Sequence, residues 1–145
     1  MSDEFEKCVE KGKLTKFTRG GSVTAKKISE AFEDFNDAKT GLGTKRYKWA
    51  TIQLYYAMFN AGNALLMKKG YREKNSHYCL IIGVKELYIN TGELDITFID
   101  ALQKGKVLRE SASYHSEWSE EACKELLKDA EKFLNRAREI IDEKK

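Results

Sequence analysis

The chain has 145 residues, the usual size of a single domain, which is enough to bury one core but not two. It contains no proline, and charged residues make up 34% of it, a composition that favours helices. The 26 basic and 23 acidic residues are mixed along the chain and leave a net charge of +3. The overall charge therefore does not by itself indicate nucleic-acid binding, and any RNA contact must be local.

The three cysteines, Cys8, Cys79 and Cys123, are odd in number and lack C-x-x-C spacing. We therefore expect neither a disulfide framework nor a tetrahedral zinc site. The N-terminal residues are acidic, whereas a secretory signal begins with a basic segment followed by an apolar one. Both features favour a reducing cytoplasm as the location of the protein.

The first segment is expected to be a short helix over residues 3–10, with Phe5, Cys8 and Val9 on one side. A basic stretch follows and ends at a pair of glycines, Gly20 and Gly21. We interpret residues 1–21 as an N-terminal arm appended to a helical domain that spans residues 22–145.

The next helix is predicted to begin at a cap formed by Ser22 or Thr24 and to end at Gly41 and Gly43. Its apolar residues recur at the i, i+3, i+4, i+7 spacing of a buried stripe: Ile28, Ala31, Phe32, Phe35 and Ala38. One side of this helix is therefore expected to face the core.

The most apolar segment runs from about residue 46 to residue 69, and residues 49–67 within it carry no charge. Its length would allow a membrane span, but Gln53, Asn60 and Asn63 would need partners in hydrocarbon, and no second span exists to supply them. We favour the central helix of a soluble bundle, because a helix that is apolar all round is a buried helix.

Three more helices complete the predicted fold. Ser76 is expected to cap one from residue 77 to about 89, another starts near Asp95, and the last begins after Ser116 or Ser119 and runs to about residue 143. Long helices joined by short loops imply an all-α, antiparallel up-and-down four-helix bundle with a short extra N-terminal helix.

The helix that starts near Asp95 carries an arginine on its apolar side. Phe98, Leu102, Gly105, Arg109 and Ala112 share one face of it. They do so because a step of eleven residues, at about 100° each, returns to nearly the same direction. Arg109 is therefore expected to lie in line with the apolar stripe.

The sequence offers few candidates for metal or nucleophilic chemistry. His77 and His115 are the two histidines, and neither forms an H-x-x-x-H, H-E-x-x-H or Glu-x-x-His pattern. No elbow motif of a hydroxyl nucleophile is present. We therefore expect neither a metal ion nor a cofactor.

Residues 108–116 are different, because Arg109, Tyr114 and His115 place a fixed cation, a phenol and an imidazole close together at a helix end. An imidazole can take a proton from a ribose 2′-hydroxyl or give one to a leaving oxygen, and an arginine can hold the charge that builds on phosphoryl oxygens. The combination suits metal-independent phosphodiester chemistry.

The spacing within this run complicates such a site in one chain. In a continuous helix Tyr114 lies about 140° and His115 about 120° away from Arg109. Either the helix ends near Ser113 and the chain bends, or a second subunit completes the site across a two-fold axis. The alternative is that Arg109 snorkels or pairs with an acid while His115 and Ser116 start the next helix.

Two stretches point to a known family. Residues 47–61 contain Tyr55-Tyr56-Ala57-Met58-Phe59-Asn60-Ala61, which looks like a family helix with the pattern Y-Y-A-M-F-H-A. The run from Gly70 to Lys74, followed by residues 76–80, matches as well. From about residue 22 to residue 141 the sequence resembles the HEPN domains (higher eukaryotes and prokaryotes nucleotide-binding), in particular their small stand-alone archaeal and bacterial members.

The functional signature of that family is an Arg followed after four to six residues by His, and Arg109 with His115 fits this pattern. In closer relatives the run resembles R-E-x-A-D-Y, in which Tyr114 rather than His115 takes the last motif position and Ser113 replaces the acid. The resemblance implies a helical bundle that dimerises and brings two copies of the motif into one cleft. In many members it implies metal-independent RNA cleavage with toxin behaviour, and in others only nucleotide binding.

Our hypothesis is a homodimer of the HEPN type that binds RNA or a nucleotide in the cleft between its subunits. Arg109 would stabilise the phosphoryl transition state and His115 would be the general acid or base, while Tyr114, Glu110 and Asn60 would contact the substrate. One alternative is a non-catalytic partner of a small nucleotidyltransferase in a two-component toxin–antitoxin system. The other is an interaction bundle without a ligand.

Overall fold

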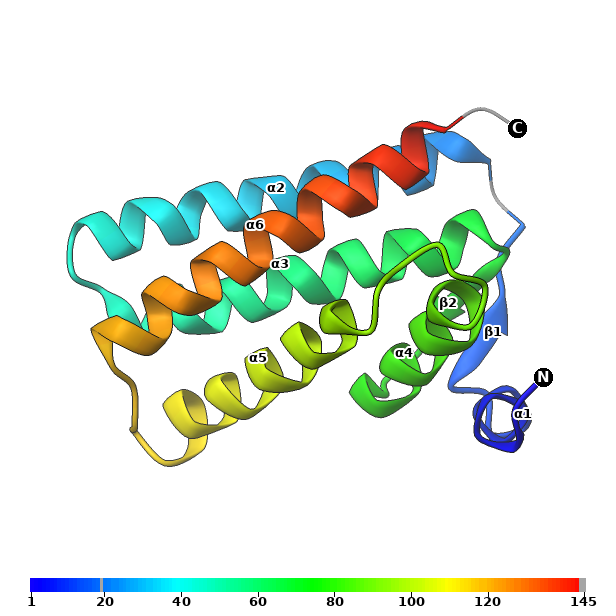
Figure 1. Ribbon diagram of the computed structural model, residues 1–145, viewed down its shortest axis with the longest axis horizontal. Helices are drawn as coiled ribbons and strands as arrows, with labels where there is room; N and C mark the ends of the chain where they lie inside the picture. The colour runs from blue at the N-terminus through cyan, green and yellow to red at the C-terminus, as the bar shows by residue number, and fades with distance from the viewer. Residues whose placement is uncertain (19, 144–145) are drawn as a thin grey trace.

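Four long helices run alternately up and down along the molecule and form its body (Figure 1). They are α2 (Gly21–Gly43), α3 (Tyr47–Lys68), α5 (Thr97–Tyr114) and α6 (Glu120–Asp142). The computed structural model describes residues 1–18 and 20–143. Arg19, in the predicted arm, and residues 144–145, at the end of the predicted bundle domain, lie outside the described residues.

Shorter elements gather at the end of the bundle where the chain begins (Figure 1). They are α1 (Asp3–Glu10), β1 (Leu14–Lys16), β2 (Tyr71–Glu73), α4 (His77–Val84) and the π-helical turn η1 (Lys85–Ile89). The predicted all-α bundle with an extra N-terminal helix is confirmed, and the two short strands add a feature that the sequence analysis did not foresee. The predicted helix from residue 77 to about 89 is present, but its second half is wound as a π-helix.

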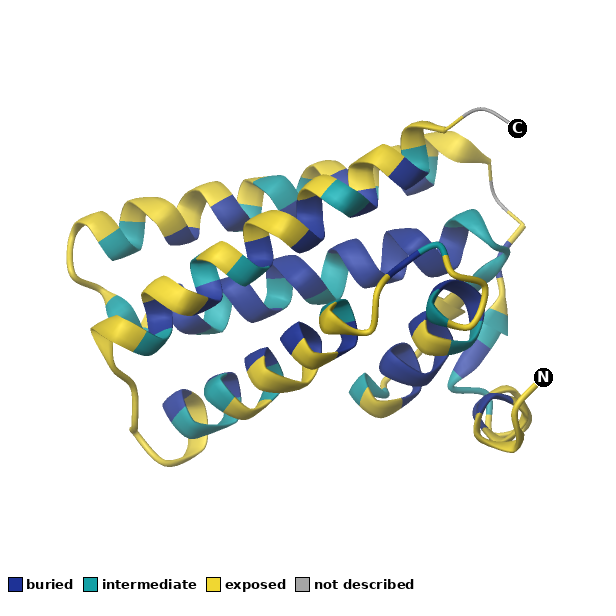
Figure 2. Cartoon of the chain, in the orientation of Figure 1, coloured by how far each residue is buried: buried dark blue, intermediate teal, exposed yellow. Residues whose placement is uncertain are grey.

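Helix α3 is the centre of the fold, since α2, α5, α6 and α4 all pack against it. Figure 2 shows buried and half-buried residues along most of α3, whereas α2 and α6 expose their outer sides. Ala50, Ala57, Ala61 and Ala64 of α3 are fully buried, and their small side chains let neighbouring helices approach closely. The predicted central helix is therefore confirmed.

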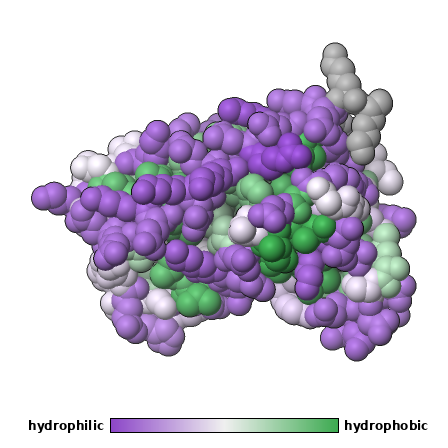
Figure 3. Space-filling view, in the orientation of Figure 1, coloured by the Kyte–Doolittle hydropathy of each residue, from purple (hydrophilic) through white to green (hydrophobic). Residues whose placement is uncertain are grey.

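Hydrophilic side chains cover most of the face that α2 and α6 present in Figure 3. On the same view, hydrophobic side chains gather lower down, toward α5 and α4. Within the part of the chain that the structure describes, no helix combines the length and the apolar character that crossing a membrane requires.

The helix starts depend on side-chain caps at two of the predicted places. The Ser76 hydroxyl accepts a hydrogen bond from the backbone N–H of Cys79 (3.0 Å), and the Ser119 hydroxyl accepts one from Ala122 (3.1 Å). Helix α2 instead begins after Gly20 without a side-chain cap, so the predicted cap at Ser22 or Thr24 is wrong. Thr24 lies inside the first turn of α2, where its side chain is buried against the core.

The N-terminal segment is packed into the fold. Phe5 and Leu14 are buried, and β1 pairs with β2 in an antiparallel register that places Thr15 opposite Arg72. The Phe5 ring also meets the Tyr71 ring edge to face, with 5.3 Å between the ring centroids. Contacts from α1 and β1 therefore reach both β2 and α4.

A disulfide bond joins Cys8 of α1 to Cys79 of α4, and the expectation of unpaired cysteines is wrong. The two residues are 71 positions apart in the sequence, but α1 packs against α4 and brings their Cα atoms to 5.7 Å, within the range of a disulfide. Cys123 is a buried free cysteine. Spacing alone did not reveal this pair, because its partners meet only through the tertiary fold.

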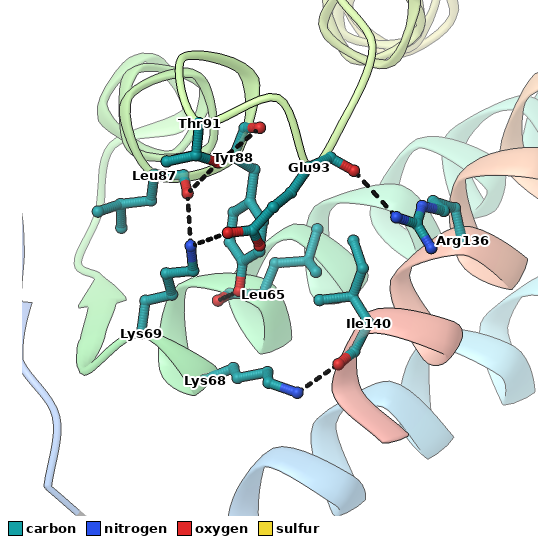
Figure 4. A network of polar contacts seen from close by, with 9 residues as sticks. All are labelled: Leu65, Lys68, Lys69, Leu87, Tyr88, Thr91, Glu93, Arg136 and Ile140. Carbon is teal, nitrogen blue, oxygen red and sulfur yellow. Dashed lines mark hydrogen bonds and ion pairs between the residues drawn. The ribbon is translucent and has the colours of Figure 1, made fainter. Parts of the chain in front are cut away.

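A polar network ties the end of α3 to η1 and α6 (Figure 4). The Lys68 ammonium donates to the carbonyl of Ile140 and so places a cation at the C-terminus of α6. The Lys69 ammonium pairs with Glu93 (2.6 Å) and donates to a carbonyl of η1 (2.9 Å). Arg136 of α6 donates to the Glu93 carbonyl (3.1 Å), so all three elements are joined at this end.

Helix α5 approaches α3 closely at Gly105. A Cβ atom placed there would lie 2.7 Å from Cε of Met58 and 3.2 Å from the Tyr55 ring. A side chain at this position would crowd the end of Met58 and the Tyr55 ring, so that one or both would have to shift.

We predict that Gly105→Val lowers the free energy of unfolding by about 1–3 kcal/mol, the usual cost of overpacking a core. Gly43→Val is the matched control, because no atom lies within 4 Å of a Cβ placed at Gly43. Urea unfolding followed by circular dichroism measures both. Equal midpoints for the two variants would show that close packing at Gly105 is not needed.

Candidate functional site

Arg109 lies on the side of α5 that faces α3, one turn after Gly105. Leu102, Gly105 and Ala112 on the same side are buried, and the Arg109 side chain is buried with them, with 8% of the residue exposed. The predicted position of Arg109 within the apolar stripe is therefore confirmed.

Three tyrosines surround the guanidinium group of Arg109. Its central carbon lies 5.7 Å from the ring centroids of both Tyr55 and Tyr56, on α3, and 5.4 Å from that of Tyr114. Nη1 of Arg109 donates a hydrogen bond to the Tyr114 hydroxyl (3.0 Å). The cation is thus held by ring faces and one phenol oxygen.

The same guanidinium lacks the partner that a buried cation usually has. None of the ion pairs among the described residues involves Arg109. Its Nε is buried without a hydrogen-bond partner, and it is the one side-chain atom of the described residues in that state. Buried donors are nearly always satisfied, so an unsatisfied N–H on a buried cation points to a group that receives an anion.

His77 joins this site from the first turn of α4. Its Nδ1 lies 2.6 Å from the Tyr55 hydroxyl oxygen, and its ring stacks on the Tyr55 ring with 5.5 Å between centroids and 10° between planes. The centroid of the Phe59 ring lies 4.6 Å from that of the His77 ring. We call Tyr55, Tyr56, Phe59 and His77 the aromatic cluster.

Burial sets the protonation of this cluster at neutral pH. Burial lowers the pKa of His77, and the positive charge of Arg109 lowers it further. Burial also raises the pKa of the Tyr55 phenol, and this effect outweighs the opposing influence of Arg109. A neutral imidazole is therefore hydrogen-bonded to a neutral phenol next to a fixed cation.

His77 is not among the site residues that the sequence predicts. Tyr55 and His77 are 22 positions apart, and which side of α4 would face α3 cannot be read from periodicity. A signal was present, because residues 55–61 and 76–80 were the two stretches that resembled one family. Their shared resemblance could have suggested that they meet.

The structure brings Arg109 and Tyr114 together, while the described hydrogen bonds of the other predicted site residues go to other groups. Helix α5 continues through Tyr114, a residue that is 68% exposed and whose hydroxyl reaches back to Arg109. Glu110 pairs with Lys106 (3.3 Å), one turn earlier on α5.

Asn60 and His115 have no described contact with the guanidinium. The Asn60 amide donates to the Asp34 carboxylate of α2 (2.9 Å). His115 is exposed just past the end of α5, where its backbone N–H donates to the Ser111 carbonyl (3.1 Å). Both stay predictions as site residues.

No group of three His, Cys, Asp or Glu side chains among the described residues is placed to hold a metal ion. The side chains placed around the Arg109 cation are phenols and an imidazole. This set can bind an anion and exchange a proton beside it.

The helices that form this site lie within the part of the chain that is similar to known proteins. The model of the HEPN domain matches residues 25–142, which include α3, α4 and α5. A protein of Methanocaldococcus jannaschii named "Putative toxin MJ0605" is 28% identical over 117 residues, which are 80% of this chain and 87% of that protein. A second protein of the same organism, "Putative toxin MJ0142", is 28% identical over 118 residues, 80% of each chain.

We predict that Arg109→Met leaves the thermal midpoint unchanged or raises it. Removing a cation from water costs several kcal/mol, whereas a cation–π contact returns about 0.5–2 kcal/mol, so an apolar chain of similar length suits the site at least as well. Differential scanning calorimetry at pH 7 tests this. A clear fall of the midpoint would mean that Arg109 serves to stabilise the fold.

We also predict that the thermal midpoint falls as the pH drops below about 6.5, the ordinary pKa of histidine. Because the pKa of His77 is lowered in the folded state, the unfolded chain takes up a proton first, and stability is lost until the folded pKa is passed. His77→Gln should lose this part of the pH dependence. His115→Gln, which removes the other histidine, should keep it, and the reverse result would assign the effect to His115.

Proposed function

The chain belongs to the HEPN domain family, and on this premise we propose that it is a toxin-like homodimer that binds RNA through Arg109 and cleaves it without a metal ion. The observation that carries the proposal is the buried Arg109, which has no acidic partner among the described residues and an unsatisfied Nε. The names of the two relatives, "Putative toxin MJ0605" and "Putative toxin MJ0142", support the same class of function.

One edge of the Arg109 guanidinium is suited to bind a phosphate. The described hydrogen bond of Arg109 uses Nη1, which leaves the edge formed by Nε and Nη2 for a ligand. This edge can hold two oxygens of a phosphate with parallel hydrogen bonds. Tyr114 is exposed at the helix end, so its hydroxyl, which accepts from Nη1, can also contact a phosphate bound beside the guanidinium.

A second copy of the chain would supply what one copy lacks. His115 is exposed beyond the end of α5 and has no described contact with Arg109 of its own chain. Across a two-fold axis the same segment of another copy can reach the cleft, so that each Arg109 meets the other copy's imidazole. In this arrangement Arg109 holds the phosphoryl charge, and His115 gives a proton to the leaving oxygen.

The toxin names of the relatives also bear on the cellular partner. A toxin requires a component that neutralises it, and we propose a small nucleotidyltransferase in this role, in a two-component toxin–antitoxin system. If the chain binds nucleotides but does not cleave RNA, it would be the non-catalytic half of such a pair.

The proposal is tested with Arg109→Gln. Binding of a fluorescent single-stranded RNA should weaken roughly 10- to 100-fold, because hydrogen bonds to a charged group contribute about 1.5–3 kcal/mol, and cleavage should be lost. Arg138→Gln is the matched control, since its guanidinium also lies over a ring, that of Phe32 (4.1 Å), but on the side of α6 that faces α2. Chelation of metal ions should leave the cleavage rate of the wild type unchanged.

Two measurements complete this test. Light scattering after size exclusion should give the mass of a dimer for the wild type and for both variants. RNA binding that is equal for Arg109→Gln and Arg138→Gln would rule out Arg109 as the phosphate ligand. A monomer that nonetheless cleaves RNA would rule out the composite site.

A further inference from the structure

The aromatic cluster contains an imidazole that neither the signature of the family nor the proposed function uses. We propose that His77 is the general base of the site, taking the proton from the ribose 2′-hydroxyl, and that Tyr55 is the residue that positions it. This inference rests on the proposed function, because it concerns the RNA whose phosphate Arg109 holds.

The geometry fixes which nitrogen of His77 faces the substrate. Nδ1 is engaged by the Tyr55 hydroxyl at 2.6 Å, and the ring is held by stacking on Tyr55 and by contact with Phe59. Proton exchange therefore falls to Nε2, which no described hydrogen bond uses. His77 is half-buried at the first residue of α4, so its ring is oriented but not sealed off from solvent.

Tyr55 connects this imidazole to the phosphate ligand. Its hydroxyl meets His77, and its ring face lies 5.7 Å from the guanidinium carbon of Arg109. Tyr56 makes a second link, since its ring centroid lies 5.7 Å from the guanidinium carbon of Arg109 and 6.2 Å from that of the His77 ring. A phosphodiester held by Arg109 thus has the 2′-hydroxyl of the adjacent ribose within a few bonds of its phosphorus and near the imidazole.

The charges around His77 keep it in the form that a base requires. Three elements face it, with the following groups: Arg109, Lys106 and Glu110 from α5, Glu73 from β2, and the phenols of Tyr55 and Tyr56 from α3. Burial, Arg109 and Lys106 disfavour the imidazolium, whereas Glu73 and Glu110 favour it. Because the net effect lowers the pKa, the imidazole is neutral at neutral pH and can accept a proton.

The proposed step balances as follows. Nε2 of His77 takes the proton of the 2′-hydroxyl while the 2′-oxygen forms a bond to phosphorus. The bond from phosphorus to the 5′-oxygen breaks, and the 5′-oxygen takes a proton from the acid, which the proposed function assigns to His115. The products are a 2′,3′-cyclic phosphate and a 5′-hydroxyl, and the His77 imidazolium, whose Nδ1–H donates to Tyr55, then returns its proton to water.

The two histidines of the chain allow a clean comparison of His77→Gln with His115→Gln. The rate of RNA cleavage is measured from pH 5 to pH 9, and affinity is measured with an RNA whose scissile nucleotide carries a 2′-deoxyribose. His77→Gln should cleave about 10²- to 10⁴-fold more slowly, the usual contribution of a general base, with affinity within roughly threefold of the wild type. It should also lose the acidic limb of the rate profile, whereas His115→Gln should retain that limb.

Tyr55→Phe tests the positioning role. It keeps the ring and removes the oxygen that accepts from the imidazolium, so the acidic limb should move to lower pH with affinity unchanged. A tyrosine that only packs the core would leave the limb in place.

Nuclear magnetic resonance of the imidazole Cε1–H groups gives a readout that does not depend on activity. His115→Gln identifies which of the two signals belongs to His77. Arg109→Gln should raise the pKa of His77, because a nearby positive charge is removed. An unchanged His77 pKa would overturn the inference that the two side chains share a site.

The outcomes separate the two proposals. If His77→Gln cleaves with the rate and pH profile of the wild type while Arg109→Gln does not cleave, the assignment of His77 is wrong and the proposed function stands. If the wild type neither binds nor cleaves RNA, the proposed function fails and the role of His77 fails with it.

Discussion

The need to bury α3 on nearly all sides governs the structure. Its charge-free middle is covered by α2 and α6 on one side and by α5 and α4 on the other, so each neighbour must meet it closely. Small residues of α3 and Gly105 of α5 make that approach possible. The polar side chains of α3 are then enclosed between helices and need hydrogen-bond partners there.

The candidate site is a result of this enclosure. Tyr55 finds its hydrogen-bond partner in His77 of α4, and its ring face lies near Arg109 of α5. Tyr55 of the central helix thereby connects α4 with α5. Arg109 is buried beside these rings, and its Nε has no hydrogen-bond partner among the described residues.

Periodicity and caps predicted much of the fold. The stripe through Phe98, Leu102 and Arg109 placed the cation on the inner side of α5, and Ser76 and Ser119 marked two helix starts. These features depend on neighbours within one helix, so a single sequence contains them. The positions of His115 and Asn60 in a functional site depend on contacts that one copy of the chain does not test.

What the sequence did not reveal depends on how helices are rotated against each other. The pair of His77 with Tyr55 and the bond of Cys8 with Cys79 each join distant segments, and neither leaves a local pattern. The pairing of β1 with β2 is similar, because three-residue strands are too short for a visible alternation. The N-terminal segment, predicted to be an appended arm, meets β2 and α4 through these same contacts.

The disulfide bond has a topological consequence. It closes a covalent ring through 71 positions of sequence, which contains all of α2 and α3. A protease that cuts once in the turn between these helices would leave both pieces attached to each other. Separation of α2 from the central helix by such a cut would then require the disulfide to be reduced as well.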